Sequence, residues 1–532
     1  MNKNDKIYEK ANLRSEEIAA LELRALYEQN GYRKYRMSRF EEYSLYANNR
    51  DFLAGDKVLT FTDLDGRLMA LKPDVTMSII KNTENSDTDP EKLYYVENVY
   101  RESRESNSFR EIRQIGLEMI GTVETPQIAE VLGMAAKTLA TVGDDFVLEV
   151  SHMGFTEELL RTMALTGEDY AHILRLISDK NPDGVRKVAA EAGVPAAMID
   201  KICALTSLDG APEAVLAAAE QLAVNGAMMA ALQELGAVCR ALEATGLADH
   251  VRMDLSMVND IDYYNGVIFK GYFRNSAARV LAGGQYDRAM RKLGREAGAI
   301  GFALYLDEIA RMEEVTVPDT AADWLTIALP KGRLGDQVYE ILSRSGYACS
   351  AYEDKNRKLV VEDPDNGVRY ILVKPSDVPV YVEHQAADVG IVGKDILMEH
   401  APDVYELMDL GIGKCRMCVC GPEESRELLR HHEMIRVASK YPNIAREYFY
   451  NRKHQTVDII KLNGSVELGP IVDLGDVIVD IVETGSTLKE NGLTVLEEVC
   501  PISARMIVNQ VSMQMKTRRI REIMANVRDC LE

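Results

Sequence analysis

The chain has 532 residues, 46% hydrophobic and 27% charged, which is ordinary for a folded protein of about two to four domains. Its 62 basic and 84 acidic residues give a net charge of −22, which argues against a general nucleic-acid or anionic-membrane surface, because both need a basic face. There is no signal-peptide pattern and no apolar run of roughly 18 residues. The eight cysteines form no disulfide framework, so we expect a cytoplasmic protein.

The first recognisable elements are a helix and a pair of strands. Apolar residues recur at helical spacing in residues 7–29, and Gly31 ends that pattern. The segment 66–76 is typical of a strand that ends in a polar corner. Two strand patterns, 93–101 and 109–121, are joined by a charged turn. Hydrophobic strands joined in this way predict an antiparallel sheet.

Further motifs follow this strand pair. They are D-I-D-Y-Y-N-G at 260–266, L-A-G-G-Q-Y-D at 281–287 and A-I-G-F-A-L at 299–304. Together with the strands they resemble the class II aminoacyl-tRNA synthetases, and histidyl-tRNA synthetase most closely. The resemblance implies an α+β class II synthetase-like antiparallel-sheet domain over residues 1–313. Its Ala-rich stretch at about 155–247 has helical spacing and predicts a helical insertion.

Two departures argue against a tRNA-charging enzyme, which is nevertheless one alternative. Asn259 stands where the synthetase has an arginine that helps to activate the carboxylate, and Asn has no charge for that task. The anticodon-binding domain is also missing after Pro318. The first half resembles the ATP phosphoribosyltransferase regulatory subunit, which implies a histidine sensor. The residues that this implies are Asp74, Thr76, Arg101, Gln114, Glu118, Tyr263 and Tyr264, unless they are satisfied polar groups of an antiparallel core.

The second half begins after a polar linker at 314–323. An apolar strand from Trp324 runs into Lys331-Gly332-Arg333, a pattern that fits either an anion site or a solvated turn. Arg357 and Lys374 add further cations. Short strands alternate with helical segments, which predicts α/β lobes with largely parallel sheets and ligands at the carboxyl ends of the strands.

Cysteine and histidine clusters in this half invite a metal interpretation. Cys415, Cys418 and Cys420 are interleaved with apolar residues, as in a strand packed on both faces. Structural zinc needs four ligands, and no second pair with suitable spacing follows. We therefore predict buried free thiols, and we interpret the His431-His432 doublet as solvated.

The most informative stretch is V-I-V-D-I-V-E-T-G-S-T-L-K-E-N-G at 477–492. A β-branched strand carries Asp480 and ends in the loop 483–487. Gly485 lets the backbone approach a ligand closely, and three hydroxyls add donors, so the loop suits a phosphate monoester. Asp480 and Glu483 can accept hydrogen bonds from sugar hydroxyls. The alternative is a tight turn with an exposed acid.

Six motifs in this order resemble the short-form ATP phosphoribosyltransferases along residues 324–532. They are L-P-K-G-R, D-V-P-x-Y-V-E-H, A-D-V-G-I-V-G-K-D, K-Y-P-N-I-A-R-E-Y-F, K-L-N-G-S-V-E-L and D-I-V-E-T-G-S-T-L-K-E-N-G. Gln385 and Gly469 depart from the usual glycine and alanine, away from the implied chemistry. The resemblance implies a two-lobed α/β periplasmic-binding-protein-like (type II) domain with a second lobe at about 416–504. A solute-binding protein is the alternative for such a fold.

The resemblance also implies the reaction, the first step of histidine biosynthesis, in which ATP and phosphoribosyl pyrophosphate give phosphoribosyl-ATP and pyrophosphate. L-histidine would inhibit this reaction. Mg²⁺ would be carried on pyrophosphate and would not be held by protein alone. The protein would form a homo-oligomer that binds neither nucleic acid nor membrane. Asp480 and Glu467 would be catalytic. Phosphoribosyl pyrophosphate would bind Asp480, Glu483, Thr484, Gly485, Ser486, Thr487 and Leu488, and the phosphates of ATP and pyrophosphate would face Lys331, Gly332, Arg333, Arg357 and Lys374.

Overall fold

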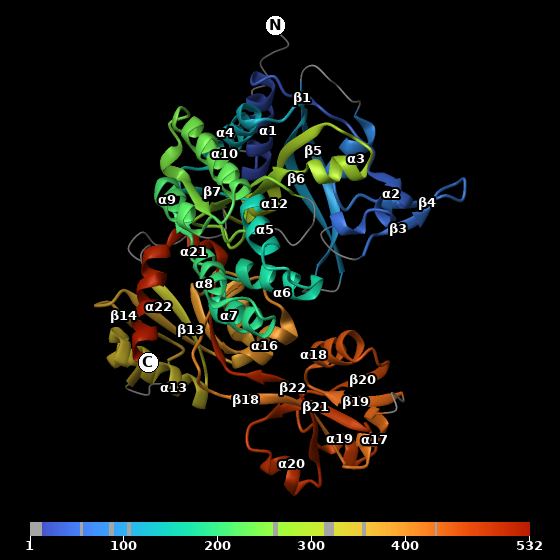
Figure 1. The fold of residues 1–532 in the computed structure, drawn as a ribbon, viewed down its shortest axis with the longest axis vertical. Helices are drawn as coiled ribbons and strands as arrows, with labels where there is room; N and C mark the ends of the chain where they lie inside the picture. The colour runs from blue at the N-terminus through green and yellow to red at the C-terminus, as the bar shows by residue number, and fades with distance from the viewer. Residues whose placement is uncertain are drawn as a thin grey trace. The chain divides into compact units, whose positions relative to one another are not determined.

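The computed structural model describes residues 13–53, 57–83, 90–103, 108–258, 264–312, 324–353, 358–430 and 434–531. Contacts between residues divide the chain into two compact units, Met1–Asp319 and Thr320–Glu532 (Figure 1). The predicted linker at 314–323 lies outside the described residues, as does the His431-His432 doublet. In the described parts of the chain, every helix is too short or too polar to cross a membrane.

The first unit contains a nine-stranded sheet and a separate, smaller three-stranded sheet. The nine strands, in spatial order, are β1 (Arg33–Lys34), β5 (Glu91–Ser103), β6 (Ser108–Gly121), β12 (Gly298–Tyr305), β11 (Leu281–Gln285), β10 (Val267–Phe273), β7 (Phe146–His152), β9 (Val251–Asp254) and β8 (Asp209–Gly210). The three are β2 (Phe40–Glu42), β4 (Leu68–Leu71) and β3 (Thr60–Thr62).

The predicted strand pair is confirmed, because β5 and β6 are antiparallel along their whole lengths. Alternation along β6 gives the sheet two different faces. Ile115, Leu117 and Met119 are fully buried in the main hydrophobic core, whereas Gln114 and Glu118 point to the opposite face. That second face also carries an apolar cluster, which includes Ile120 of β6, so Gln114 and Glu118 are buried polar groups beside apolar side chains.

Helices cover the apolar face and form the predicted insertion. Helices α4 and α10 pack on β7, and α4 also packs on β10 and β12 (Figure 1). The α-helices of this unit are α1 (Ser15–Gln29), α2 (Tyr43–Ala47), α3 (Thr76–Asn82), α4 (Thr125–Val142), α5 (Met153–Arg161), α6 (Gly167–Ser178), α7 (Pro182–Glu191), α8 (Ala196–Leu205), α9 (Pro212–Leu222), α10 (Gly226–Glu243), α11 (Asp287–Lys292) and α12 (Leu306–Met312).

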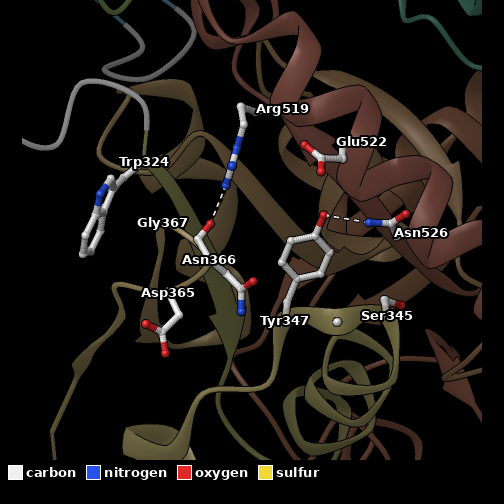
Figure 2. A pocket seen from close by; sticks show the side chains of 10 residues that line it. Trp324, Ser345, Tyr347, Asp365, Asn366, Gly367, Arg519, Glu522 and Asn526 are labelled. Carbon is white, nitrogen blue, oxygen red and sulfur yellow. Dashed lines mark hydrogen bonds between the residues drawn. The ribbon is translucent and has the colours of Figure 1, made fainter.

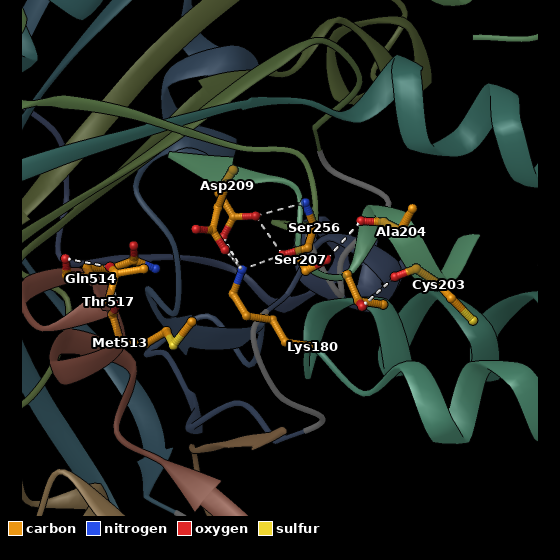
Figure 3. A network of polar contacts seen from close by, with 11 residues as sticks. Lys180, Cys203, Ala204, Ser207, Asp209, Ser256, Met513, Gln514 and Thr517 are labelled. Atoms are coloured by element: carbon orange, nitrogen blue, oxygen red, sulfur yellow. Dashed lines mark hydrogen bonds and ion pairs between the residues drawn. The ribbon is translucent and has the colours of Figure 1, made fainter. Parts of the chain in front are cut away.

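A buried lysine ties the helical insertion to the sheet. Lys180, between α6 and α7, adopts a left-handed backbone conformation with a φ of 55°. Its Nζ donates to Asp254 Oδ2 at 2.6 Å, to Ser256 Oγ at 2.7 Å and to Asp209 Oδ2 at 3.1 Å (Figure 3). A buried ammonium group is stable only when such partners replace water, so the network fixes the insertion against β8 and β9.

The second unit contains two sheets, which define its two lobes. The first lobe has, in spatial order, β14 (Val360–Asp363), β15 (Val368–Val373), β13 (Leu325–Pro330), β16 (Val389–Gly393), β23 (Ala504–Val508) and β17 (Tyr405–Asp409). The second lobe has β20 (Val457–Lys461), β19 (Ile435–Ser439), β21 (Val477–Val482), β18 (Cys415–Gly421) and β22 (Thr494–Ile502).

The prediction of largely parallel sheets is wrong. Among the described strands of this unit, β13 is parallel to β15 and β16, and β19 is parallel to β20 and β21. The pairs β14–β15, β16–β23, β17–β23, β18–β21 and β18–β22 are antiparallel. The strands β18 and β23 each begin where the chain has just crossed between lobes, and each runs back against the parallel core of its new sheet.

The chain crosses between the lobes twice. The first crossing, between β17 and β18, contains Gly411 and Gly413, whose φ values are 65° and 61°. Because side-chain-bearing residues rarely adopt this conformation, the two glycines allow the backbone to turn. The second crossing, between β22 and β23, is Ser503 alone.

Helices connect the strands of the second unit, and others follow the last strand, β23. They are α13 (Arg333–Leu342), α14 (Ser350–Glu353), α15 (Val378–Glu383), α16 (Lys394–His400), α17 (Ser425–Arg430), α18 (Pro442–Arg446), α19 (Leu468–Ile471), α20 (Ser486–Glu490), α21 (Gln510–Met515) and α22 (Thr517–Leu531). Cys418 and Cys420 are free and fully buried on β18, which confirms the prediction for these two thiols, whereas Cys415 is free but only partly buried.

Candidate active site and candidate ligand pocket

Asp480 lies near the end of β21, the middle strand of the second-lobe sheet. Its side chain is half-buried, and Cys418 of β18 is its direct cross-strand partner. Burial raises the pKa of Asp480 to about 6, the Ile481 N–H (2.8 Å) opposes this rise, and the Glu467 carboxylate adds to it. A carboxylate that has lost part of its hydration interacts more strongly with a positive charge placed beside it.

The predicted hydroxyl loop follows β21 directly. Thr484, Ser486 and Thr487 are exposed, and the Thr484 and Ser486 hydroxyl oxygens are 3.0 Å apart. Gly485 has a φ of 77° and precedes α20, so this turn requires glycine. The Leu488 side chain is buried in the apolar cluster beneath the loop, so only its main chain can contact a ligand.

Basic side chains gather at the carboxyl ends of neighbouring first-lobe strands. Pro330 of β13 pairs with Val373 of β15, so the exposed residues Lys331 and Lys374 follow adjacent strand ends. Gly332 has a φ of 98°, and the exposed Arg333 begins α13. Parallel pairing therefore brings these predicted residues to one edge of the sheet. Arg357 lies outside the described residues.

A close approach at Gly335 fixes the position of this basic segment. A Cβ added at Gly335 would lie 1.8 Å from the carbonyl oxygen of Pro330. Only glycine therefore lets α13 begin so near the end of β13. The position of Lys331, which follows Pro330, depends on this contact.

Residues that were not assigned from the sequence also surround Asp480. Asp395 of α16, in the first lobe, accepts a hydrogen bond from the Tyr441 hydroxyl of the second lobe at 3.1 Å. Asp395 and Lys440 both act electrostatically on Asp480, the acid raising its pKa and the lysine lowering it. The K-Y-P-N motif contains Lys440 and Tyr441, and the A-D-V-G-I-V-G-K-D motif ends at Asp395, but neither motif indicated that the two segments meet.

A second carboxylate of α16 joins the two lobes. The Glu399 carboxylate accepts hydrogen bonds from the backbone N–H groups of Asn443 and Ile444, with Oε2 at 3.0 and 3.1 Å. The Asn443 side chain donates in turn to the Glu399 carbonyl at 2.9 Å. Because Glu399 is only 7% exposed, these buried bonds make α16 a firm contact with α18 beside Asp480.

The polar face of the first unit holds most of the residues predicted for a histidine pocket. The Glu118 carboxylate accepts hydrogen bonds from the Thr76 hydroxyl at 2.8 Å and the Tyr286 hydroxyl at 2.6 Å. Burial raises the pKa of Glu118 to about 8, those two hydroxyls oppose the rise, and Asp74 adds to it. Burial likewise raises the pKa of Asp74, and Arg101, 3.6 Å away, opposes that rise. Tyr263 lies outside the described residues, as does Asn259.

Glycines and an unpaired acceptor shape this face. A Cβ at Gly301, the cross-strand partner of Glu118, would lie 1.7 Å from Glu118 Oε2. A Cβ at Gly284 would lie 2.9 Å from the Tyr264 ring, whose hydroxyl pKa burial raises strongly. Within the described residues, the buried Gln114 Oε1 has no hydrogen-bond partner. Such an acceptor is unfavourable unless something donates to it, so this face can accept a polar ligand.

A cavity of about 400 Å³ lies elsewhere in the second unit, among α22, residues 345–347 and the turn 365–367 (Figure 2). Its polar groups already bond one another, as Arg519 Nη2 does to the Asn366 carbonyl at 2.6 Å and Asn526 Nδ2 to the Tyr347 hydroxyl at 3.0 Å. None of the predicted site residues lines it. The described residues contain no cluster of three or more His, Cys, Asp or Glu side chains suited to a metal ion.

Both halves of the chain match known families. The family model described as histidyl-tRNA synthetase matches residues 8–309, and that described as ATP phosphoribosyltransferase matches residues 374–529. The ATP phosphoribosyltransferase of Lachnospira eligens is 62% identical over 210 residues, 39% of this chain and 97% of that protein. The first half of the chain therefore belongs to the histidyl-tRNA synthetase family, and the second half to the ATP phosphoribosyltransferase family.

Further comparisons agree with this fusion of two families. The ATP phosphoribosyltransferase of Lachnoclostridium phytofermentans is 58% identical over 209 residues, 39% of this chain and 97% of that protein. A solved structure from Bacillus halodurans C, titled an ATP phosphoribosyltransferase regulatory subunit/histidyl-tRNA synthetase, covers 68% of this chain and 88% of its own, with a TM-score of 0.51 and 22% identity. That likeness shows a shared fold, and the resemblance drawn from the sequence is confirmed for both halves.

Proposed function

We propose that the chain condenses ATP with phosphoribosyl pyrophosphate to give phosphoribosyl-ATP and pyrophosphate, the first step of histidine biosynthesis. The observation that carries this proposal is the half-buried Asp480 carboxylate at the end of a strand that continues into an exposed hydroxyl loop. Sequence identity of 62% to an ATP phosphoribosyltransferase over nearly its full length supports the same reaction.

The substrates divide between the lobes in this proposal. Thr484, Ser486 and Thr487 bind the 5′-phosphate together with the main chain of Gly485 and Leu488, while Glu483 and Glu467 accept bonds from ribose hydroxyls. Lys331, Arg333 and Lys374 face the phosphates of ATP and of the leaving pyrophosphate, together with Gly332 and Arg357. The exposure of the three described cations supports this role, because a bound phosphate needs unburied donors.

The chemistry needs positioning and charge stabilisation more than a strong base. Adenine N1 is a neutral nucleophile and needs no base to activate it. The N1–C1′ bond forms while the C1′–O bond to pyrophosphate breaks. Positive charge develops on the ribose, and Asp480, helped by Glu467, stabilises it. Desolvation of Asp480 strengthens that interaction. Pyrophosphate leaves with Mg²⁺, which prefers phosphate oxygens and water to a site made by protein alone, so the metal belongs to the substrate.

The first unit senses L-histidine as a feedback inhibitor in this proposal. Glu118 and Gln114 accept bonds from the imidazole N–H groups, Arg101 binds the carboxylate, and Asp74, Thr76, Tyr263 and Tyr264 complete the pocket. The orphan acceptor of Gln114 supports a bound donor. Inhibition requires that histidine favour one state of the whole chain, typically by about 1–3 kcal/mol of coupling. Covalent fusion keeps sensor and enzyme at high effective concentration.

Several features of the assembly belong to the same proposal. We assign residues 1–313 to the sensor and 324–532 to the enzyme, with a second lobe at about 416–504. The two mixed sheets, joined by two crossings, support a periplasmic-binding-protein-like (type II) arrangement of the enzyme. We expect a cytoplasmic homo-oligomer.

An ultraviolet assay for the modified adenine product tests the proposal. The purified full chain, given ATP, phosphoribosyl pyrophosphate and Mg²⁺, should form the product, and added L-histidine should slow it. Absence of product under these conditions would refute the enzymatic assignment. Histidine-dependent pyrophosphate exchange without phosphoribosyl pyrophosphate would instead revive the tRNA-charging alternative.

A further inference from the structure

One exposed ion pair joins two residues that the proposed function assigns to different substrates. Arg333 Nη2 of the first lobe donates to both carboxylate oxygens of Glu483 in the second lobe, at 2.7 and 2.8 Å. The two side chains are 150 positions apart in the chain and are 72% and 53% exposed. Arg333 is proposed to bind phosphates, and Glu483 is proposed to bind ribose hydroxyls.

We propose that Glu483 is a positioning residue that holds Arg333 until the substrates displace the pair. The inference rests on the proposed function and names an exchange of partners at that site. A phosphate replaces the Glu483 carboxylate on the guanidinium, and ribose hydroxyls replace Arg333 on the carboxylate. No covalent bond changes in this exchange.

The energetics favour displacement. An exposed ion pair is weak because water solvates both charges well, so little is lost when the pair opens. In this pair one nitrogen, Arg333 Nη2, donates to both Glu483 oxygens, whereas a guanidinium can bind phosphate oxygens through two parallel N–H donors, and a multiply charged phosphate attracts it more strongly. Breaking the pair for one substrate also frees the partner that the other substrate needs, so each substrate helps the other to bind.

The contacts of α16 explain how the pair can open without separating the lobes. The buried bonds from Glu399 to Asn443 and Ile444 hold the lobes together at another place. The Arg333–Glu483 pair is exposed and lies at the ends of two long side chains. Side-chain rotation alone therefore breaks it.

The probe is inorganic pyrophosphate with Mg²⁺, which contains no ribose and therefore isolates the Arg333 side of the exchange. Its dissociation constant is measured by calorimetry on the full chain and on two variants, Glu483→Gln and Glu498→Gln. Glu498 forms a matched exposed pair with Arg416 at 3.0 Å, but both partners belong to the second lobe. We expect Glu483→Gln to bind pyrophosphate about two- to fivefold more tightly, and Glu498→Gln to equal the parent.

A double variant separates the exchange from simple charge repulsion. In an Arg333→Gln background the gain from Glu483→Gln should vanish, because the pair no longer exists. A gain that persists there, an equal gain in Glu498→Gln, or no gain in Glu483→Gln would each overturn the exchange. Structural damage would weaken binding, so it cannot imitate the expected result.

Failure of the exchange differs from failure of the proposed function. If the parent chain forms product and binds pyrophosphate through Arg333 but Glu483→Gln binds no tighter, only the exchange is refuted. If the parent forms no product, the proposed function is refuted. If Arg333→Gln binds pyrophosphate as tightly as the parent, Arg333 has no phosphate role and the exchange falls with that assignment.

Discussion

Replacing Asp480 by asparagine should stabilise the second unit at pH 8 while it lowers turnover by orders of magnitude. Asn keeps the size of the side chain and an oxygen for the Ile481 N–H, but it removes the charge that burial penalises. A residue retained only for the fold would give the opposite result, because its replacement would destabilise the protein. The two outcomes therefore distinguish a functional carboxylate from a structural one.

The size of the effect follows from the pKa of Asp480, which is raised from 3.8 to about 6. An acid whose pKa is raised by folding binds its proton more tightly in the folded state, so stability is fully present below pH 3.8 and falls as the pH rises towards 6. At about 1.4 kcal/mol per pH unit, this interval corresponds to an upper bound of about 3 kcal/mol above pH 6. For a unit of this size, that is at most about 6–12 °C in Tm.

The assay is thermal or denaturant unfolding of the parent and D480N at pH 8 and again near pH 4. The gain should be present at pH 8 and nearly absent near pH 4, where the parent carboxyl is protonated in the folded state. Asp476 is a matched control, because its hydrogen bonds from Arg436 lower its pKa. D476N should therefore destabilise the unit at pH 8. A D480N protein that is less stable than the parent at pH 8 would refute the reasoning.

Three further predictions concern pH, backbone packing and inhibition. Because the reaction needs ionised Asp480, kcat/KM should fall as the pH drops below about 6, and a flat profile from pH 5 to 8 would contradict this. Gly335→Ala should destabilise the second unit by about 1–3 kcal/mol and raise the KM for ATP, whereas Gly464→Ala, whose added Cβ meets nothing within 4 Å, should leave the Tm within about 2 °C. Glu118→Gln should raise the histidine concentration needed for half-inhibition at least about tenfold above pH 8, where Glu118 is ionised and a lost charged hydrogen bond is worth about 1.5–3 kcal/mol, and an unchanged inhibition curve there would place the sensor elsewhere.

Some of the candidate site could be predicted because it is local in the chain. The loop 483–488 follows the strand that carries Asp480, so the carboxylate and the hydroxyls are adjacent by covalent connection. Predicting that Lys331 and Lys374 lie close together required one further step. Each follows a strand, and parallel pairing brings the strand ends together, as Pro330 and Val373 show.

Other parts of the site depend on contacts that no local pattern reveals. Asp395 and Tyr441 are 46 positions apart in the chain. They are in contact only because α16 of the first lobe packs on the second lobe. Tyr286 reaches Glu118 across 168 positions, and the space for that carboxylate comes from Gly301. The mixed sheets were missed for a related reason. Alternating helices and strands within a lobe predict parallel pairing. The direction of a strand that follows a crossing between lobes depends instead on the side from which the chain enters the new sheet, which the order of elements does not show.

The distribution of charge explains why neither lobe can act alone in the proposed reaction. The described cations proposed for the phosphates, Lys331, Arg333 and Lys374, belong to the first lobe, and the acids Asp480, Glu467 and Glu483 belong to the second. The scissile C1′–O bond joins the ribose, which the acids contact, to the pyrophosphate, which the cations contact. As that bond breaks, positive charge develops on the acid side and negative charge on the basic side, so each lobe stabilises the charge formed next to it. Rate enhancement in this proposal therefore requires both lobes around one pair of substrates. When no substrate is bound, one cation of the first lobe, Arg333, pairs with one acid of the second lobe, Glu483.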